Sequence, residues 1–155
     1  MIDGVVLRQL RLVADERGWL MEVLRTDWEL FERFGQAYIT AAYPQVVKAW
    51  HMHEKQTDNI ACVKGIIKLV LYDGREPSST HGEIYEIVLG EKNPTLVKIP
   101  PQIWHGFKNI GLEVAIVMNV PTKLYNYQKP DEHRLPAETT KIRYDWKLAP
   151  WLKHG

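Results

Sequence analysis

The stretch that decides the fold runs from residue 51 to residue 65: His51-Met52-His53-Glu54-Lys55-Gln56-Thr57-Asp58-Asn59-Ile60-Ala61-Cys62-Val63-Lys64-Gly65. Two histidines are separated by one residue, an acid follows after four residues, and a glycine follows after six more. Because side chains alternate between the two faces of a strand, His51 and His53 are expected on one face. Gly65 predicts a turn into the next strand.

A second stretch supplies a third histidine: Ile99-Pro100-Pro101-Gln102-Ile103-Trp104-His105-Gly106-Phe107-Lys108-Asn109. His105 follows a proline-rich turn and begins another strand. The first stretch resembles the first cupin motif. Pro100, His105 and Asn109 match the second cupin motif, in which Gln102 replaces a glycine. This resemblance implies an all-β cupin fold, a double-stranded β-helix or jelly roll that can enclose a ligand cavity.

The remaining sequence also indicates an all-β protein, because turn signals recur at short intervals between apolar and β-branched runs. These runs predict strands at residues 5–13, 19–24, 36–43, 46–52, 60–63, 66–72, 84–89, 95–99 and 114–120. One short N-terminal helix is expected after Thr26, because Thr26 and Glu29 form a capping box and Gly35 can end a helix. The tail from Thr122 is expected to be irregular.

Composition limits the classes of function. The chain has 155 residues without a linker or repeat, which predicts one domain over residues 1–155. Its net charge of +1 favours neither nucleic acid nor a membrane surface as a partner. The single cysteine, Cys62, excludes an internal disulfide, and neither a signal-peptide pattern nor an apolar run of ~20 residues is evident. A cytoplasmic location is expected.

Two kinds of chemistry suit the histidines. Three imidazoles and a carboxylate, from His51, His53, His105 and Asp58, could hold iron, manganese, nickel or zinc. Alternatively, the same inward face binds a sugar without any metal. Both interpretations remain open from the histidines alone.

Four segments, in the same order along the chain, favour the sugar. Residues 15–22 (DERGWLME) are similar to the Asp-x-Arg-Gly-aromatic-x-x-Glu stretch of the dTDP-4-dehydrorhamnose 3,5-epimerases. Residues 48–51 (KAWH) resemble their Arg-Gly-Leu-His. Residues 72–82 (YDGREPSSTHG) resemble their Asp-x-Arg-x-x-Ser-x-Thr-x-Gly, and residues 99–107 resemble their Ile-Pro-x-x-x-Ala-His-Gly-Phe.

The resemblance implies a role for each matching residue. His51 falls on the general base, which removes the proton beside the C4 keto group of a nucleotide-linked 4-keto-6-deoxy sugar. Lys48 stands in place of a phosphate-binding arginine. Arg17 and Glu22 fall on residues that contact the nucleotide, partly across a dimer interface. His105 falls on a polar position of the pocket.

Two further residues are expected to bind substrate. Trp50 lies beside His51 in the sequence and offers an aromatic face for a base or sugar. His53 stands where the resembling family has a glutamine.

The match breaks at the residues that assist the base. Where the family has the tyrosine that acts as general acid, this chain has Met118 and Asn119. Tyr125 and Tyr127 follow a few residues later, and Tyr125 is the candidate acid. The family orients its base with an aspartate, for which Glu138 is the candidate here. A lysine expected in the loop after His51 is either replaced by Asp58 or displaced to Lys55.

The leading hypothesis is a homodimeric epimerase or isomerase, without a cofactor, that acts on a dTDP-linked 4-keto sugar. Its expected catalytic residues are His51, Tyr125 and Glu138, and its expected binding residues are Arg17, Glu22, Lys48, Trp50, His53 and His105. One alternative is a metal-dependent cupin enzyme that uses the three histidines and Asp58. Another is a nucleotide-sugar-binding cupin without activity, because the tyrosine is missing.

Overall fold

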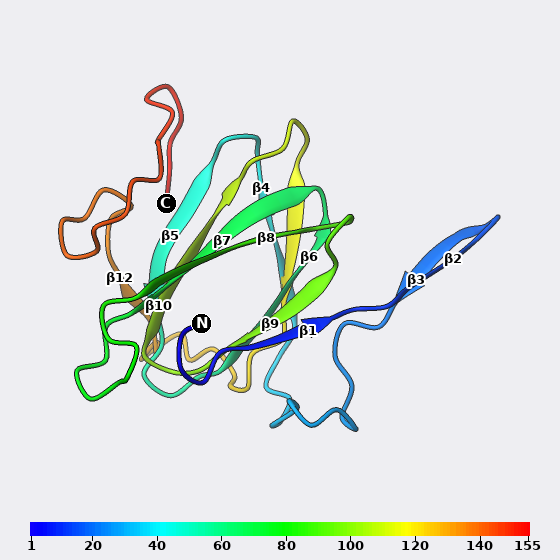
Figure 1. Ribbon diagram of the computed structural model, residues 1–155, viewed down its shortest axis with the longest axis horizontal. Helices are drawn as coiled ribbons and strands as arrows, with labels where there is room; N and C mark the ends of the chain where they lie inside the picture. Colours follow the sequence, from blue (N-terminus) through cyan, green and yellow to red (C-terminus); the bar gives the residue numbers. More distant parts are fainter.

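The chain folds as a β jelly roll, which confirms the expected fold class (Figure 1). The computed structural model describes residues 1–155 and contains strands, turns and irregular segments, with no helix. It therefore has no helix long and apolar enough to cross a bilayer. Two five-stranded antiparallel sheets face each other, and a separate two-stranded hairpin extends from them.

The first sheet, in spatial order, contains β1 (Val6–Gln9), β9 (Thr95–Ile99), β6 (Asp58–Lys64), β11 (Ala115–Asn119) and β4 (Tyr38–Ala42). The second sheet contains β12 (His133–Arg134), β5 (Val47–Met52), β10 (Ile103–Asn109), β7 (Ile66–Asp73) and β8 (Ile84–Gly90). Neighbouring strands in each sheet are far apart in the sequence, except for β7 and β8, which follow each other along the chain. Residues of both sheets can therefore converge on the space between them.

The main core fills one part of that space. Its fifteen buried residues come from both sheets and include Leu69 and Leu71 of β7, Val97 of β9 and Ile103 of β10. Residues at every second position of a strand share a face, so these apolar side chains point inward together. The rest of the space between the sheets is lined by polar side chains and forms the pocket described below.

The hairpin of β2 (Leu12–Asp15) and β3 (Gly18–Met21) projects away from the body (Figure 1). Its strands pair only with each other. Trp19 and Leu20 on it are 51% and 63% exposed. Large apolar side chains that are exposed to water on an extended hairpin are unfavourable for a single chain, and such surfaces typically mark an interface.

The prediction of an N-terminal helix is wrong. Residues 26–30 form turns, and the chain then runs in an irregular segment to β4. Long-range contacts hold this segment in place of helical hydrogen bonds: the Gly35 amide donates to the Pro121 carbonyl at 3.0 Å, and Arg33 donates to the Thr122 carbonyl at 2.7 Å. Leu30 packs into a small core cluster with strand residues. Tertiary contacts therefore override the capping signal.

Residues 72–82, one of the four segments that resemble the epimerases, include the loop after β7. The arginine and hydroxyl side chains of this loop bind one buried carboxylate. Asp73 is fully buried and accepts hydrogen bonds from Arg75 at 2.8 Å, Ser78 at 2.5 Å and Thr80 at 2.6 Å. Burial raises the pKa of Asp73, but these donors outweigh it and hold the pKa far below the usual range. This segment therefore organises a loop and lies outside the pocket.

Candidate active site

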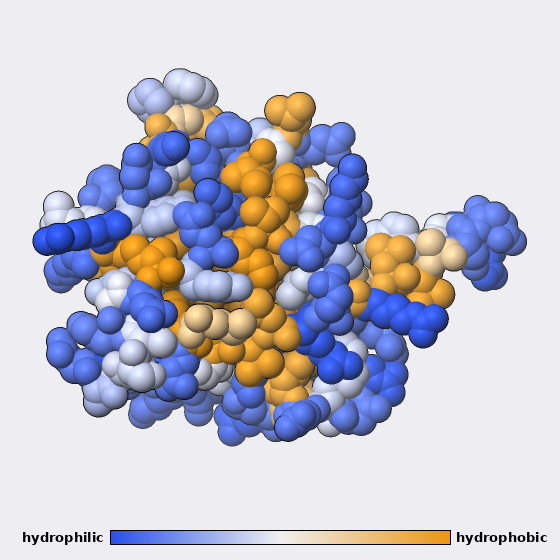
Figure 2. Space-filling model, viewed as in Figure 1, coloured by the Kyte–Doolittle hydropathy of each residue, from blue (hydrophilic) through white to orange (hydrophobic).

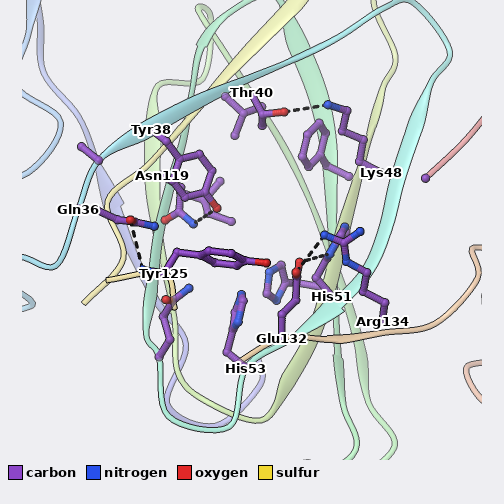
Figure 3. Close-up of a pocket in the computed structure, with 18 of the residues that line it drawn as sticks. Gln36, Tyr38, Thr40, Lys48, His51, His53, Asn119, Tyr125, Glu132 and Arg134 are labelled. Atoms are coloured by element: carbon purple, nitrogen blue, oxygen red, sulfur yellow. Dashed lines mark hydrogen bonds and ion pairs between the residues drawn. The ribbon is translucent and has the colours of Figure 1, made fainter. Parts of the chain in front are cut away.

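The pocket lies between the two sheets and has a volume of about 680 Å³, within the usual range for small-molecule sites (Figure 3). Both sheets contribute to its walls, and the tail after β11 contributes the remainder. Its charged and hydrogen-bonding side chains are Gln36, Tyr38, Thr40, Lys48, His51, His53, Gln56, His105, Asn119, Tyr125, Tyr127, Glu132 and Arg134. A site with this lining suits a polar ligand.

The three expected histidines meet in this pocket. His51 of β5 is the register partner of His105 of β10, and their ring centroids are 6.3 Å apart. His53 follows β5 directly, and its ring centroid lies 5.9 Å from that of His105. One small molecule can therefore contact all three imidazoles.

A bulge places Lys48 on the same wall as His51. Phe107 pairs with Lys48 and His105 pairs with His51, so two steps along β10 correspond to three along β5. The extra residue shifts the alternation of side chains, and both Lys48 and His51 line the pocket. The Lys48 ammonium donates to Thr40 Oγ1 at 2.8 Å. Its positive charge therefore faces the site.

His51 is oriented by Glu132 from the tail (Figure 3). Nδ1 of His51 lies 3.1 Å from Glu132 Oε1, and Arg134 donates to the other oxygen of Glu132 at 2.9 Å. Because a carboxylate only accepts, Nδ1 carries the proton and leaves Nε2 free to accept one. Burial lowers the pKa of His51, and Glu132 opposes this partly. The imidazole is therefore neutral near pH 7, as a general base must be.

His53 and His105 are arranged differently. Nδ1 of His105 lies 3.1 Å from the Ile103 carbonyl, and Nδ1 of His53 hydrogen-bonds the Asp131 carbonyl. Their Nε2 atoms both lie 3.4 Å from Asp58 Oδ2. Burial lowers the pKa of His105 to about 4, although Asp58 raises it. His105 is thus a neutral polar group of the site.

Three phenols line the pocket, those of Tyr38, Tyr125 and Tyr127, and Tyr127 is 89% exposed. Tyr125 extends its ring across the pocket with its hydroxyl toward His51 and Glu132 (Figure 3). Tyr38 of β4 accepts a hydrogen bond from Asn119 at 2.9 Å. Burial and the charge of Asp58 raise the pKa of Tyr38, which makes it a weaker acid. Tyr125 therefore remains the better candidate proton donor.

Two expectations from the sequence disagree with this geometry. Trp50 is 0% exposed and packs against Trp146 and Tyr144 behind β5, so it cannot stack on a ligand. The β-bulge sends its side chain to the outer layer instead of the pocket. Glu138 is exposed and lies outside the pocket, and Glu132 occupies the position beside His51 that was expected for Glu138.

Arg17 and Glu22 also lie outside the pocket of their own chain. Arg17 is in the hairpin turn, where it pairs with Asp15, and Glu22 pairs with Arg25 at 2.5 Å. The hairpin points away from the body that contains the pocket (Figure 1). These two side chains can meet a pocket only in another copy of the chain.

No sequence pattern indicated Glu132, Arg134 or Tyr38 as site residues. The first two belong to a tail without periodicity, and β12 pairs with β5 only in the folded chain. Tyr38 lies in an expected strand, but nothing in its neighbours indicates that it faces a pocket. Asn119, which stands where a tyrosine was expected, also lines the pocket.

The fold and site together define a jelly-roll protein with a polar, histidine-lined pocket that contains a neutral, carboxylate-oriented imidazole. The family model described as dTDP-4-dehydrorhamnose 3,5-epimerase matches residues 1–153. The chain belongs to this family and is a sugar-nucleotide epimerase, as the sequence resemblance predicted.

Individual relatives agree. The "Probable low-salt glycan biosynthesis epimerase Agl13" of Haloferax volcanii is 46% identical over 147 residues, which cover 94% of each chain. The spore coat polysaccharide biosynthesis protein SpsL of Bacillus subtilis is 41% identical and covers 94% of this chain and 97% of its own. The crystal structure of a dTDP sugar isomerase from Desulfovibrio desulfuricans G20 is 36% identical, with a TM-score of 0.90, covering 96% of this chain and 94% of that one.

Proposed function

We propose that the protein epimerises a dTDP-linked 4-keto-6-deoxy sugar and that Nε2 of His51 is the base. The imidazole takes a proton from a carbon beside the C4 carbonyl, and the electron pair of the broken C–H bond moves onto the carbonyl oxygen to form an enolate. This role is supported by one observation above all: Glu132 holds the proton on Nδ1, so that Nε2 is free to act.

The second half of the reaction needs a proton donor on the opposite face of the sugar. Tyr125 donates its phenolic proton to the same carbon, and the enolate collapses back to the ketone with inverted configuration. The position of its hydroxyl across the pocket from His51 supports this role (Figure 3). Exchange with water then removes the extra proton from His51 and reprotonates the phenolate of Tyr125. In each turnover His51 therefore acts as the base and Tyr125 as the acid.

The substrate's diphosphate binds near Lys48. This side chain is the cation on the pocket wall that is not paired with a carboxylate, since Arg134 is held by Glu132. An ammonium supplies charge to phosphate without the bidentate geometry of an arginine. His53 and His105 supply polar contacts to the sugar.

The active assembly is a homodimer in which the hairpin of one chain brings Arg17 and Glu22 to the partner's pocket. Two surface features support it. The hairpin exposes Trp19 and Leu20 in water. A band of apolar surface also runs across the face formed by the edge strands β8 and β1, where Val6, Ile84 and Val88 are exposed (Figure 2). Surfaces of this kind typically bind another chain.

The compartment that we propose is a reducing cytoplasm. Cys62 is a free, buried thiol. Burial raises its pKa to about 11, so it stays protonated and unreactive there.

Solvent exchange tests the function directly. In deuterated water, the wild-type protein should incorporate deuterium beside the keto group of dTDP-4-keto-6-deoxyglucose, detected by NMR or mass spectrometry. His51→Ala should lose exchange by at least ~10²-fold, the usual contribution of a general base. Exposed His81 provides the matched control, because His81→Ala should exchange as fast as wild type. Exchange at the wild-type rate in His51→Ala would end the assignment of the base.

A further inference from the structure

Three potential ligand atoms converge beside His51. Nε2 of His53 and Nε2 of His105 each lie 3.4 Å from Oδ2 of Asp58, and all three atoms lie within 4.8 Å of one another. The side chains are almost withdrawn from water, with 2% of Asp58, 9% of His105 and 11% of His53 exposed. We refer to these residues as the His53–Asp58–His105 cluster.

Hydrogen bonds fix which imidazole atoms face inward. Nδ1 of His105 is directed at the Ile103 carbonyl, and Nδ1 of His53 is directed at the Asp131 carbonyl. A carbonyl oxygen only accepts, so both Nδ1 atoms carry protons. In a neutral imidazole, Nε2 then has a lone pair. Both lone pairs point toward the carboxylate of Asp58.

The carboxylate is fixed in the same way. Oδ1 of Asp58 accepts from Gln56 at 2.9 Å and from Asn119 at 2.8 Å, which leaves Oδ2 facing the imidazoles. Three acceptor atoms in one nearly dry place repel one another unless a cation lies between them. The 3.4 Å separations are longer than a usual N–H···O hydrogen bond. These two separations match an edge of a tetrahedron, about 3.4 Å, that metal–ligand bonds of about 2.0–2.1 Å produce.

We propose that this cluster binds one divalent first-row transition-metal ion, such as Zn²⁺ or Fe²⁺. Two imidazoles with one carboxylate suit these ions, whereas Mg²⁺ and Ca²⁺ prefer oxygen ligands. Hydrogen bonds from the opposite ring nitrogen to a carbonyl are the usual support of metal-binding histidines. His51 stays outside the ligand set, because the ligand atoms that lie within 4.8 Å of one another belong to His53, Asp58 and His105 only. His53 and His105 both line the pocket, so an ion that they held would be accessible from it.

The role of the ion rests on the proposed function. When His51 removes the proton, negative charge develops on the carbonyl oxygen of the sugar. An ion held by the cluster would supply positive charge that can stabilise that enolate and speed proton removal. Binding of the ion is independent of this role and is tested separately.

Metal binding is measured on full-length protein prepared without a histidine tag, stripped with chelator and then titrated anaerobically with Co²⁺, followed by its visible d–d bands. Zn²⁺ and Fe²⁺ are tested by equilibrium dialysis and elemental analysis. One ion per chain is expected. His53→Gln and Asp58→Asn should each weaken binding by more than the roughly 10–100-fold that loss of a supporting hydrogen bond costs. Circular dichroism verifies that both variants fold.

A surface pair provides the matched control. His133 Nε2 lies 3.4 Å from Glu54 Oε1, but the His133 side chain is 51% exposed. His133→Gln should bind as wild type. The proposal is overturned if stripped wild-type protein takes up no ion, in which case a proton bridges the cluster, or if all variants bind equally. Loss of deuterium exchange on stripping and its return with metal would support the role of the ion. Full exchange by stripped protein would refute that role, whereas exchange unaffected by His51→Ala would refute the base instead.

Discussion

The partner of His51 sets the pH at which the protein works. Glu132 raises the pKa of His51 against the lowering effect of burial. In Glu132→Gln the pKa should fall, so the neutral, active imidazole persists to lower pH and the acidic limb of kcat/KM moves to lower pH. The rate should also fall by about 10²-fold, because the amide no longer fixes the proton on Nδ1. A pH series of kcat/KM measures both effects.

Arg134 offers a control of opposite sign. Its charge lowers the pKa of His51. Removing it in Arg134→Gln should therefore move the acidic limb to higher pH. Limbs that move in the same direction in both variants, or that do not move, contradict the electrostatic account.

Tyr125 should separate the two halves of the reaction. Tyr125→Phe removes the phenolic proton but leaves His51 intact, so deuterium exchange should continue while formation of the inverted product falls by about 10²–10⁴-fold. Tyr43 is 71% exposed and lies outside the pocket, so Tyr43→Phe should leave both rates unchanged. Equal losses of exchange and inversion in Tyr125→Phe would refute its role as the acid. NMR of the product and its deuterium content gives both rates.

At the scale of elements, the bulge between β5 and β10 aligns the site. Gly106 fits there because a Cβ would lie 2.3 Å from Cβ of Ala49 and 2.9 Å from the Lys48 carbonyl. Gly106→Ala should push β5 away from β10 and separate His51 from His105. We expect a loss of about 1–3 kcal/mol in the free energy of unfolding, together with lower kcat. Urea unfolding measures the first effect.

Gly74 is the matched glycine. Its nearest atom to an added Cβ is a side-chain carbon of Tyr72 at 3.3 Å, which can shift. Gly74→Ala should therefore cost less stability and leave kcat unchanged. A Gly106→Ala protein as stable and active as Gly74→Ala would contradict the steric argument.

Local sequence patterns predicted the features that depend on residues close together in the chain. Alternation of apolar residues indicated most strands, and the spacing of His51 and His53 predicted their common face. The buried Trp50 could not be predicted, because the bulge that turns it outward depends on pairing with a strand more than fifty residues later. Glu132 contacts His51 across 81 residues, and no periodicity indicates such a contact. The expected helix failed for the same reason, since its residues bind distant backbone groups.

For the whole molecule, the hairpin predicts that damaged chains can repair one another. In the proposed dimer, Arg17→Ala removes the group that one chain offers to its partner, and His51→Ala removes the proposed base from its own pocket. A mixed dimer of the two variants contains one complete site. After subunit exchange of an equal mixture, about a quarter of the wild-type activity should appear, since half of the dimers are mixed and each has one site. Turnover of the mixture, compared with each variant alone, measures it.

Each variant mixed with wild type is the control for exchange of subunits, and size-exclusion chromatography with light scattering reports the dimer. A mixture that stays as inactive as its components would show that Arg17 does not serve a neighbouring pocket. A monomeric wild-type protein with full turnover would remove the need for a second chain.

An arm that serves a neighbour makes catalysis a collective property. Turnover per chain should then decline on dilution, as pairs separate and every pocket loses its borrowed guanidinium. A chain with an altered hairpin but an intact His51 would also lower the activity of the wild-type subunits with which it pairs. Substitutions in the hairpin would therefore act in trans, whereas substitutions in the pocket would affect only their own chain.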